Sequence, residues 1–344
     1  MSGGVDSSVA AALLLAQGFD VTGVSINMFS CHAEGTRSCC SARDRMDARA
    51  VCERLGIPYL SVDRREGFRS SVMDPFVADY VAGRTPSPCV LCNSLVKFPA
   101  ILEEAGRLGA ELIATGHYAR VREDSGRFRL LCALDRKKDQ SYFLFGLGQD
   151  MLGRLNFPLG ETDKARVRAA ARNLGFANAG KKESQEVCFV PDDDYAAFVE
   201  VRARDDIRGA GDFVDTAGRR VGSHQGIHRY TIGQRRGLGF GTGQRQYVTA
   251  IDAAQNVVVL GAKTDLDRRE ISVRSLSWTH QDNAVDRDAI VKVRSAHQGA
   301  RARIRMQGKE CCRVIFEEPV SAPAPGQAAV FYDGDEVLGG GWIE

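Results

Sequence analysis

The feature that most limits the possible folds is the segment Ser2–Ser7, which reads Ser-Gly-Gly-Val-Asp-Ser and runs directly into an apolar helical stretch at 7–17. Two glycines let backbone N–H groups approach an anion closely, and the N-terminus of the following helix adds partial positive charge. The structural alternative is a glycine turn capped by serine, against which the length of the run argues. The segment therefore predicts an anion-binding loop.

The first half of the chain alternates between helical and β-type patterns. Helical patterns at 7–17, 42–55, 68–82 and 93–108 are separated by short apolar or β-branched runs at 20–26, 59–62 and 112–114. This alternation predicts an α/β doubly wound parallel sheet, which binds ligands beyond the carboxyl ends of its strands. An anion loop of this kind should follow the first strand, yet only Met1 precedes it. We therefore expect that the chain begins late, through a mis-assigned start codon or a truncation, and that the first strand is missing.

The second half has a different texture, with frequent glycines and short β-type runs at 247–251, 257–260, 290–293 and 312–316. These patterns predict two small, mostly β domains. Since 344 residues exceed the size of a single compact core, we expect three domains. They are a doubly wound α/β domain at 1–198, a small β-rich domain at 199–264 and a β-barrel-like domain at 265–344.

Composition excludes some classes of protein. Apolar residues make up 44% of the chain and charged residues 26%, which argues against disorder. No apolar run approaches the roughly 18 residues of a membrane helix, and no secretory signal pattern opens the chain. We expect a cytoplasmic protein with no membrane partner. Its ten cysteines are then more typical of reduced, catalytic or metal-binding thiols than of structural disulfides.

Charge is unevenly distributed although the net charge is only +2. The stretch 219–245 holds six arginines and no acidic residue, and the stretch 287–313 holds eight basic and two acidic residues. Two interpretations stay open: solvated loops, or a surface that follows phosphates.

Two cysteine segments are candidates for nucleophilic chemistry. Cys89 and Cys92 lie in a proline-rich loop that we expect to lead into a helix beginning near Asn93, where a thiolate would be stabilised. Cys188 follows two lysines in sequence, although a buried inert thiol is the alternative there. Cys89-x-x-Cys92 could also be half of a zinc site, but no second pair completes it.

The Ser2–Ser7 loop lacks the Gly-Lys-Ser/Thr of kinases and resembles the pyrophosphate loop of enzymes that split ATP between the α and β phosphates. Taken together, segments along most of the chain resemble the tRNA-specific 2-thiouridylases. The matching segments are 2–8, 39–41 with Asp44 and Asp47, 83–86, 92–93, 114–118, 138–144, 157–160, 184–189, 230–239 and 325–332.

This resemblance implies ATP-dependent 2-thiolation of the wobble uridine of tRNA, by adenylation of the uracil 2-oxygen and sulfur transfer from a cysteine persulfide. Cys92 would be the nucleophile and Cys188 the persulfide carrier, and the two would end as a disulfide. The residues implied to line the ATP site are Ser2, Gly3, Gly4, Val5, Asp6, Ser7, Ile26 and Gly116. The residues implied to contact tRNA are Ser87, Pro88, Cys89, His117, Lys138, Asp139, Gln140, Arg294, Ser295 and Gln327.

Cofactors and partners follow from the same resemblance. ATP and Mg²⁺ are implied, together with the anticodon loop and stem of tRNA and a persulfide-donating protein such as a cysteine desulfurase or a sulfur-relay protein. Many relatives carry Asp where this chain has Cys89, which leaves the acid–base group in question. Cys89, Cys92 and Cys188 could instead ligate an iron–sulfur cluster.

Two other interpretations of the chain stay open. One is another pyrophosphate-loop ligase, such as an amidotransferase synthetase or a tRNA lysidine synthetase, neither of which requires cysteines. The other is a non-catalytic tRNA-binding β module fused to a degenerate nucleotide fold. Release of AMP in the presence of tRNA would separate the three.

Overall fold

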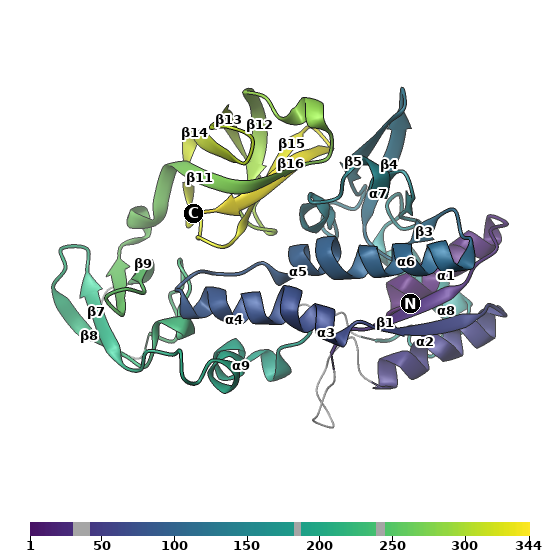
Figure 1. Ribbon diagram of the computed structural model, residues 1–344, viewed down its shortest axis with the longest axis horizontal. Helices are drawn as coiled ribbons and strands as arrows, with labels where there is room; N and C mark the ends of the chain where they lie inside the picture. Colours follow the sequence, from purple (N-terminus) through teal and green to yellow (C-terminus); the bar gives the residue numbers. More distant parts are fainter. Residues whose placement is uncertain (30–41, 182–186, 239–244) are drawn as a thin grey trace. The chain divides into compact units, whose positions relative to one another are not determined.

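The computed structural model describes residues 1–29, 42–181, 187–238 and 245–344, which divide by their contacts into two units (Figure 1). Unit 1 comprises Met1–Val72, Cys89–Asp193 and Asp335–Leu338. Unit 2 comprises Met73–Pro88, Asp194–Gly334 and Gly339–Glu344. Each unit has an apolar core of its own.

The strands of unit 1 confirm the predicted parallel α/β sheet. β1 (Gly23–Asn27) pairs in parallel with β2 (Tyr59–Asp63), and β3 (Ile113–Ala114) pairs in parallel with β6 (Leu155–Asn156). In the described residues these two pairs form separate two-stranded sheets.

Helix α1 (Val5–Ala16) begins immediately after the glycine loop and buries Val5, Val9 and Ala10. These side chains share a core with Val51 of α2 (Ala42–Leu55) and Val167 of α8 (Lys164–Asn173). The sequence patterns predicted α1 and α2 but not α8, whose N-cap Asp163 accepts a 2.8 Å hydrogen bond from Arg166 N. Burial of the apolar face of α1 fixes the loop that precedes it.

A continuous helical run replaces the predicted helix at 93–108. It consists of α5 (Pro88–Leu91), the π-helical segment η2 (Cys92–Lys97) and α6 (Phe98–Leu108). The remaining helical segments of unit 1 are α3 (Arg65–Phe68), η1 (Arg69–Met73, which ends at the boundary of the unit), η3 (Ser141–Leu144), α7 (Gln149–Leu152) and η4 (Pro191–Asp193).

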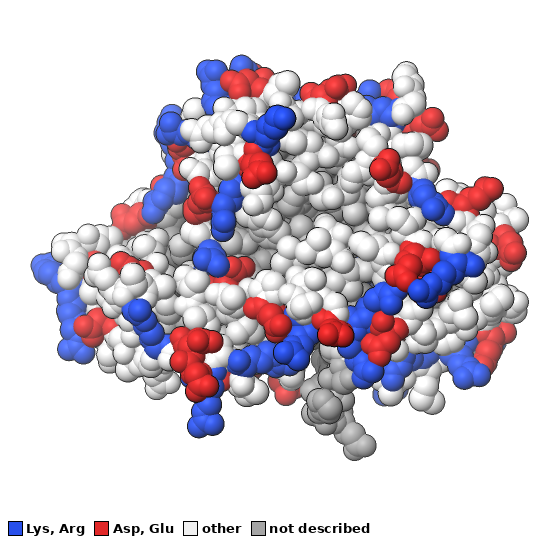
Figure 2. Space-filling model, in the orientation of Figure 1, with Lys and Arg blue, Asp and Glu red and all other residues white. Residues whose placement is uncertain are grey.

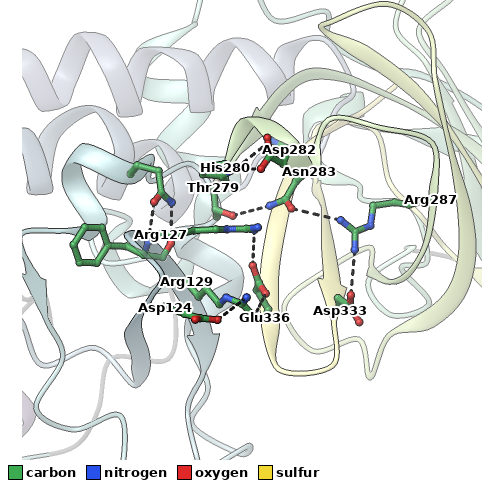
Figure 3. A network of polar contacts seen from close by, with 12 residues as sticks. Asp124, Arg127, Arg129, Thr279, His280, Asp282, Asn283, Arg287, Asp333 and Glu336 are labelled. Atoms are coloured by element: carbon green, nitrogen blue, oxygen red, sulfur yellow. Dashed lines mark hydrogen bonds and ion pairs between the residues drawn. The ribbon is translucent and has the colours of Figure 1, made fainter.

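Unit 1 also contains a hairpin that the sequence patterns did not predict, formed by β4 (Ala119–Asp124) and β5 (Arg127–Cys132). Arg127 Nη2 lies 2.7 Å from a carboxylate oxygen of Glu336, which Arg129 also approaches at 3.4 Å (Figure 3). Arg129 forms a second ion pair with Asp124 at 2.8 Å. These two arginines therefore bind the short segment Asp335–Leu338 to the hairpin of unit 1.

Unit 2 contains a four-stranded sheet in the order β8-β7-β10-β9. Its strands are β7 (Gly211–Asp215), β8 (Arg220–His224), β9 (Tyr247–Asp252) and β10 (Val257–Gly261). Helices α4 (Asp74–Val81) and α9 (Tyr195–Arg202) pack together through Tyr80 and Tyr195, whose ring centroids stack 4.6 Å apart. Burial raises the pKa of the Tyr80 hydroxyl, which marks this contact as part of the protein interior.

The rest of unit 2 is a β-barrel with the strand order β11-β14-β13-β12-β15-β16, closed by pairing of β11 with β16. Its strands are β11 (Asp267–Trp278), β12 (Arg287–Lys292), β13 (Ala300–Met306), β14 (Cys311–Ser321), β15 (Ala328–Asp333) and β16 (Glu336–Ile343). Three short 3₁₀ segments complete the unit: η5 (Ile227–Arg229), η6 (Lys263–Leu266) and η7 (Gln281–Asn283). In β14, Cys312, Val314 and Phe316 are buried while the residues between them face outward, as the two-residue period of a strand requires.

Two further observations concern the charged surface and the length of the helices. On the face drawn in Figure 2, basic and acidic side chains adjoin one another instead of forming separate fields. Among the helices of the described ranges, none is long and apolar enough to cross a membrane.

Candidate functional site

The glycine loop is shaped so that only glycine fits at its second position. Gly3 has φ of +70°, and a Cβ atom there would lie 2.2 Å from the carbonyl oxygen of Asp44. Gly4 is the N-cap of α1 in extended conformation, and the Ser7 hydroxyl donates to its carbonyl oxygen at 3.1 Å. The Ser2 and Ser7 hydroxyls lie 3.1 Å apart at the N-terminus of α1. This cradle, with hydroxyl and amide donors at a helix N-terminus, suits an anionic phosphate.

Two other residues expected at the ATP site lie in the same unit. A Cβ atom on Gly116 would lie 2.7 Å from Ser7 N, so the chain after β3 passes directly against the first turn of α1. Ile26 lies in β1 and is half-buried. Gly116 therefore allows a close approach that any larger residue would block.

Lys164, at the start of α8, was not found by sequence reasoning. Its ammonium group lies 2.6 and 2.7 Å from the two carboxylate oxygens of Asp6, and its side chain is 11% exposed. The Tyr118 hydroxyl donates to the same carboxylate at 2.9 Å, and the ammonium lies 5.7 Å from the Tyr118 ring centroid. These contacts fix the acidic residue of the loop from two distant parts of the chain.

A second lysine, Lys181, which follows α8 in the chain, joins the loop to α2 and was also not found by sequence reasoning. Lys181 Nζ donates to Gly3 O at 3.1 Å and to Asp47 at 2.8 Å, and it also contacts Asp44. Burial works to lower the pKa of Lys181, but its hydrogen bonds and ion pairs with Asp44 and Asp47 outweigh burial and raise that pKa overall. Asn178 adds a hydrogen bond from its side-chain amide to Gly3 O at 3.1 Å. The loop is thus held at one carbonyl by two side chains.

The arrangement around Cys92 corrects one prediction. The helix does not begin near Asn93; it begins at Pro88, one turn earlier, because proline has no N–H to satisfy and suits the first helical position. Cys92 therefore opens the π-helical segment η2, a geometry found frequently at functional sites. Its thiol is buried and lies 3.6 Å from the sulfur of Met28 at the end of β1.

Cys188 belongs to the same part of unit 1. The adjacent Phe189 is buried against Phe29 and Phe68, with ring centroids 6.5 and 5.5 Å apart. Phe29 follows Met28, whose sulfur contacts Cys92, so Cys92 and the residue next to Cys188 both contact the segment just after β1. Neither forms a disulfide in the structure. The matching segments at 39–41 and 184–186, and Gly239, lie outside the described residues.

Metal binding has little support in the described residues. No group of three or more His, Cys, Asp or Glu side chains gathers there in an arrangement that could hold a metal. Cys89 is exposed while Cys92 is buried, so these thiols do not form a ready cluster site. Mg²⁺ is usually held by one or two carboxylates and by substrate phosphates. Asp6 is the carboxylate of the loop that fits this pattern.

Several residues that we expect to bind tRNA make hydrogen bonds within the protein. Asp139 accepts hydrogen bonds from Ala133 N at 3.0 Å and from the Ser141 hydroxyl at 2.9 Å. Gln140 Oε1 accepts from Tyr118 N at 3.0 Å, which fixes the tyrosine that contacts Asp6. Lys138 lies half-buried in the same turn. Through Tyr118, this turn helps to hold Asp6 of the glycine loop in place.

The surroundings of His117 favour its neutral form. Burial lowers its pKa well below the ordinary value, and the nearby charge of Lys97 lowers it further. The ring lies between Phe98 and Phe157, and its Nδ1 is 2.7 Å from the Thr115 hydroxyl. A contact of His117 with tRNA would therefore not involve a charged imidazolium.

The remaining expected tRNA contacts belong to unit 2, apart from Cys89. Ser87 and Pro88 are buried, and Gln327 donates to the carbonyl oxygens of Thr85 and Pro86. Arg294 donates to Ser321 O at 2.9 Å, and Ser295 is exposed.

Ion pairs neutralise about half of the basic residues in each arginine-rich stretch. In 287–313, acids on neighbouring strands or turns pair with four arginines: Arg287 with Asp333, Arg303 with Asp288, Arg305 with Asp286 and Arg313 with Glu270. In 219–245, Arg219, Arg220 and Arg229 are paired with Asp215, Asp212 and Glu200. Arg235 and Arg236 are exposed and have no recorded ion pair among the described residues. These two adjacent arginines are candidates for phosphate contacts.

Comparison with known families matches the chain from end to end. Residues 1–192 match the model described as "tRNA methyl transferase HUP domain". Residues 198–262 match the "tRNA methyl transferase PRC-barrel domain", and residues 268–343 match the "Aminomethyltransferase beta-barrel domain".

Curated relatives match over nearly their whole length. A protein of Acidithiobacillus ferrooxidans is 45% identical over 345 residues, covering 100% of this chain and 97% of the relative. Proteins of Solibacter usitatus and Syntrophotalea carbinolica are 46% and 47% identical, covering 100% of this chain and 98% and 97% of the relatives. Each of the three relatives is named tRNA-specific 2-thiouridylase MnmA.

Proposed function

The chain belongs to the family of tRNA-specific 2-thiouridylases, and we propose that it replaces the 2-oxygen of the wobble uridine of tRNA with sulfur at the expense of ATP. One juxtaposition carries the proposal: Cys92 and the neighbour of Cys188 both pack on the end of β1, in the unit that also holds the glycine loop. Neither a ligase that needs no thiols nor a binding module accounts for this arrangement.

The chemistry explains why a phosphate loop and thiols belong in one unit. Expelling oxygen as hydroxide means expelling the base of an acid with a pKa of about 15.7. Expelling it as a phosphate monoester means expelling the base of an acid with a pKa of about 6. The uracil 2-oxygen would therefore attack the α-phosphorus of ATP, release pyrophosphate and become an adenylate. The loop Ser2–Ser7 would hold the phosphates, with Gly116 and Ile26 beside it, and Mg²⁺, if held, would bind at Asp6.

Sulfur transfer would follow at the two cysteines. The terminal sulfur of a persulfide on Cys188 attacks C2 of the uracil and AMP leaves. The Cys92 thiolate then attacks Sγ of Cys188, breaks its bond to the transferred sulfur and forms a Cys92–Cys188 disulfide. Alternatively, Cys92 first releases hydrosulfide, which attacks C2. Both routes end in the disulfide and need a dithiol reductant and a persulfide-donating protein.

No step of this proposal passes through an iron–sulfur cluster, because Cys89, Cys92 and Cys188 do not form a metal-holding group.

Substrate presentation would require the wobble base to leave the anticodon stack, since base chemistry in folded RNA requires an everted base. Arg235 and Arg236 would hold phosphates of the stem and loop.

The domain division that we propose is 1–198, 199–264 and 265–344, which the matched family ranges support.

The test is a reconstituted reaction with unmodified tRNA, ATP and a persulfide donor, in which 2-thiouridine is measured by nucleoside chromatography and AMP is measured in parallel. Cys92→Ser and Cys188→Ser should each abolish thiolation and leave tRNA binding within about twofold, because neither sulfur contacts phosphate. Cys311→Ser, at an exposed thiol of unit 2, is the matched control and should stay active. Thiolation by either single variant would remove that cysteine from the mechanism.

A further inference from the structure

The carbonyl oxygen of Gly3, in the glycine loop, is held by the turn that follows α8. Asn178 Nδ2 and Lys181 Nζ each donate a hydrogen bond to it at 3.1 Å. A carbonyl oxygen has two lone pairs, so these two donors use both of them. All three residues belong to unit 1. The direction in which this carbonyl group points is therefore set by a turn that lies far away in sequence.

The turn is itself fixed by the core of unit 1. Phe176 is buried in the same apolar core as Val9 of α1. Phe176 N donates to Ala171 O at 3.1 Å, and Lys181 N donates to Asn178 O at 2.9 Å. Since α1 and the turn share one core, the two side-chain donors keep a constant position relative to the loop that precedes α1.

The orientation of the Asn178 amide favours the loop at a cost elsewhere. Its Nδ2 also donates to Ser8 Oγ at 3.0 Å, and the Ser8 hydroxyl donates to Gly4 O at 2.9 Å. Its Oδ1 is buried and has no hydrogen-bond partner among the described residues. An unsatisfied buried acceptor lowers stability, but the reversed amide would place Oδ1 against Gly3 O. The fold therefore keeps both donor hydrogens on the loop.

Holding the Gly3 carbonyl also sets the direction of the next N–H. The peptide bond between Gly3 and Gly4 is trans, like every peptide bond of the described residues. In a trans peptide the C=O and N–H groups point to opposite sides. The Gly4 N–H therefore points away from the turn and approaches Ser2 Oγ at 3.3 Å, where the Ser2 and Ser7 hydroxyls meet. This is the side on which an anion would be bound.

We propose that Asn178 and Lys181 are positioning residues, which turn the Gly4 N–H toward a phosphate of ATP. The Lys181 ammonium also polarises the peptide group through its carbonyl oxygen, which makes the N–H a stronger donor. The effect acts on phosphate, so it concerns the triphosphate of ATP and not its adenosine part. The inference rests on the proposed function for ATP as the ligand, but not for the effect of the turn on the loop.

The test compares Lys181→Met, which removes the ammonium, with Asn178→Leu, which removes the amide at similar volume. Asn178 is uncharged and only 4% exposed, so it tests the turn without removing a charge. Lys137→Met, at an exposed lysine of the same unit, is the matched control. The Kd values for ATP and for adenosine are measured by calorimetric titration without tRNA. Hydrogen exchange of the N-terminal peptide is followed by mass spectrometry without nucleotide.

For both variants we expect the Kd for ATP to rise about tenfold, while the Kd for adenosine stays within about twofold. The amides of the loop should exchange about fivefold faster, because the loop is no longer held. Lys181→Arg, which can still donate to the Gly3 carbonyl, should recover most of the affinity for ATP. The control Lys137→Met should match the unaltered protein in all three measurements.

A loss of ATP affinity confined to Lys181→Met, with Asn178→Leu unchanged, would overturn the proposal and make Lys181 a direct phosphate ligand. Equal losses for ATP and adenosine would also overturn it, since they would indicate general damage to unit 1. If Lys181→Met unfolds, Asn178→Leu decides by the same criteria. If Asn178→Leu unfolds, loop exchange in Lys181→Met decides, because loss of a mere phosphate ligand would leave it unchanged.

The proposed function and the positioning role fail in different ways. If the unaltered protein binds ATP but does not thiolate tRNA in the reconstituted reaction, the proposed function is refuted, and the Kd values still decide the role of the turn. If the unaltered protein does not bind ATP, both are refuted.

Discussion

Replacing Lys164 with methionine tests whether the ion pair between Lys164 and Asp6 of the glycine loop stabilises unit 1. The substitution keeps most of the side-chain length and removes the ammonium group that lies 2.6 and 2.7 Å from the Asp6 oxygens. Removing one partner of a fully buried ion pair costs about 3–5 kcal/mol, because the other charge is left uncompensated. Here the Asp6 side chain is 30% exposed, and Tyr118 still donates to it. Water can therefore solvate part of the carboxylate, and we expect a loss of about 2 kcal/mol.

For a unit of this size, about 1 kcal/mol corresponds to a change in Tm of about 2–4 °C, so Lys164→Met should lower the transition of unit 1 by about 4–8 °C. Differential scanning calorimetry without ATP measures it, with Lys137→Met, at an exposed lysine of the same unit, as the control. The double variant Asp6→Asn, Lys164→Met removes both charges and should be more stable than Lys164→Met alone. A Lys164→Met transition within about 1 °C of the unaltered protein, or purely additive losses in the double variant, would refute the reasoning.

Three further predictions concern the loop, the basic surface and His117. Gly3→Ala should weaken ATP binding by about tenfold or more in calorimetric titration, since the added methyl group meets the Asp44 carbonyl and forces the loop away; unchanged affinity would remove the loop from the ATP site. Alanine at Arg235 or Arg236 should each reduce the salt dependence of tRNA binding by about one unit, whereas alanine at Arg303, which is paired with an acid, should reduce it less. Equal slopes for all three would contradict the distinction. Because the pKa of the half-buried His117 is lowered in the folded protein, the protein should lose stability as the pH falls below about 6.5, where the unfolded imidazole takes up a proton before the folded one does. The slope reaches at most about 1.4 kcal/mol per pH unit and should flatten in His117→Gln, as measured by urea denaturation from pH 7.5 to 5; an unchanged profile would show that His117 does not contribute.

Local patterns in the sequence determined the elements whose form depends on near neighbours. The segment Ser2–Ser7 predicted a glycine loop at a helix N-terminus, and the alternation at 7–114 predicted the parallel sheet, both of which the structure confirms. The short β-type run at 312–316 predicted a strand in the last domain, which the structure confirms as part of β14. Each of these patterns depends on backbone sterics and on side chains a few residues apart, so the order of residues is sufficient to predict them.

Tertiary structure decided which distant side chains meet. Lys164 reaches Asp6 across 158 positions, and Met28 reaches Cys92 across 64, although nothing near either residue in sequence indicates its partner. The stretch 287–313 looks strongly basic in sequence, but acids such as Asp333 and Glu270, brought alongside by folding, neutralise several of its arginines. The start of the helix before Cys92 was also predicted wrongly: it is Pro88 and not Asn93, although proline suits the first helical position. Contacts of this kind depend on how helices and strands pack, which residue order specifies only through the whole fold.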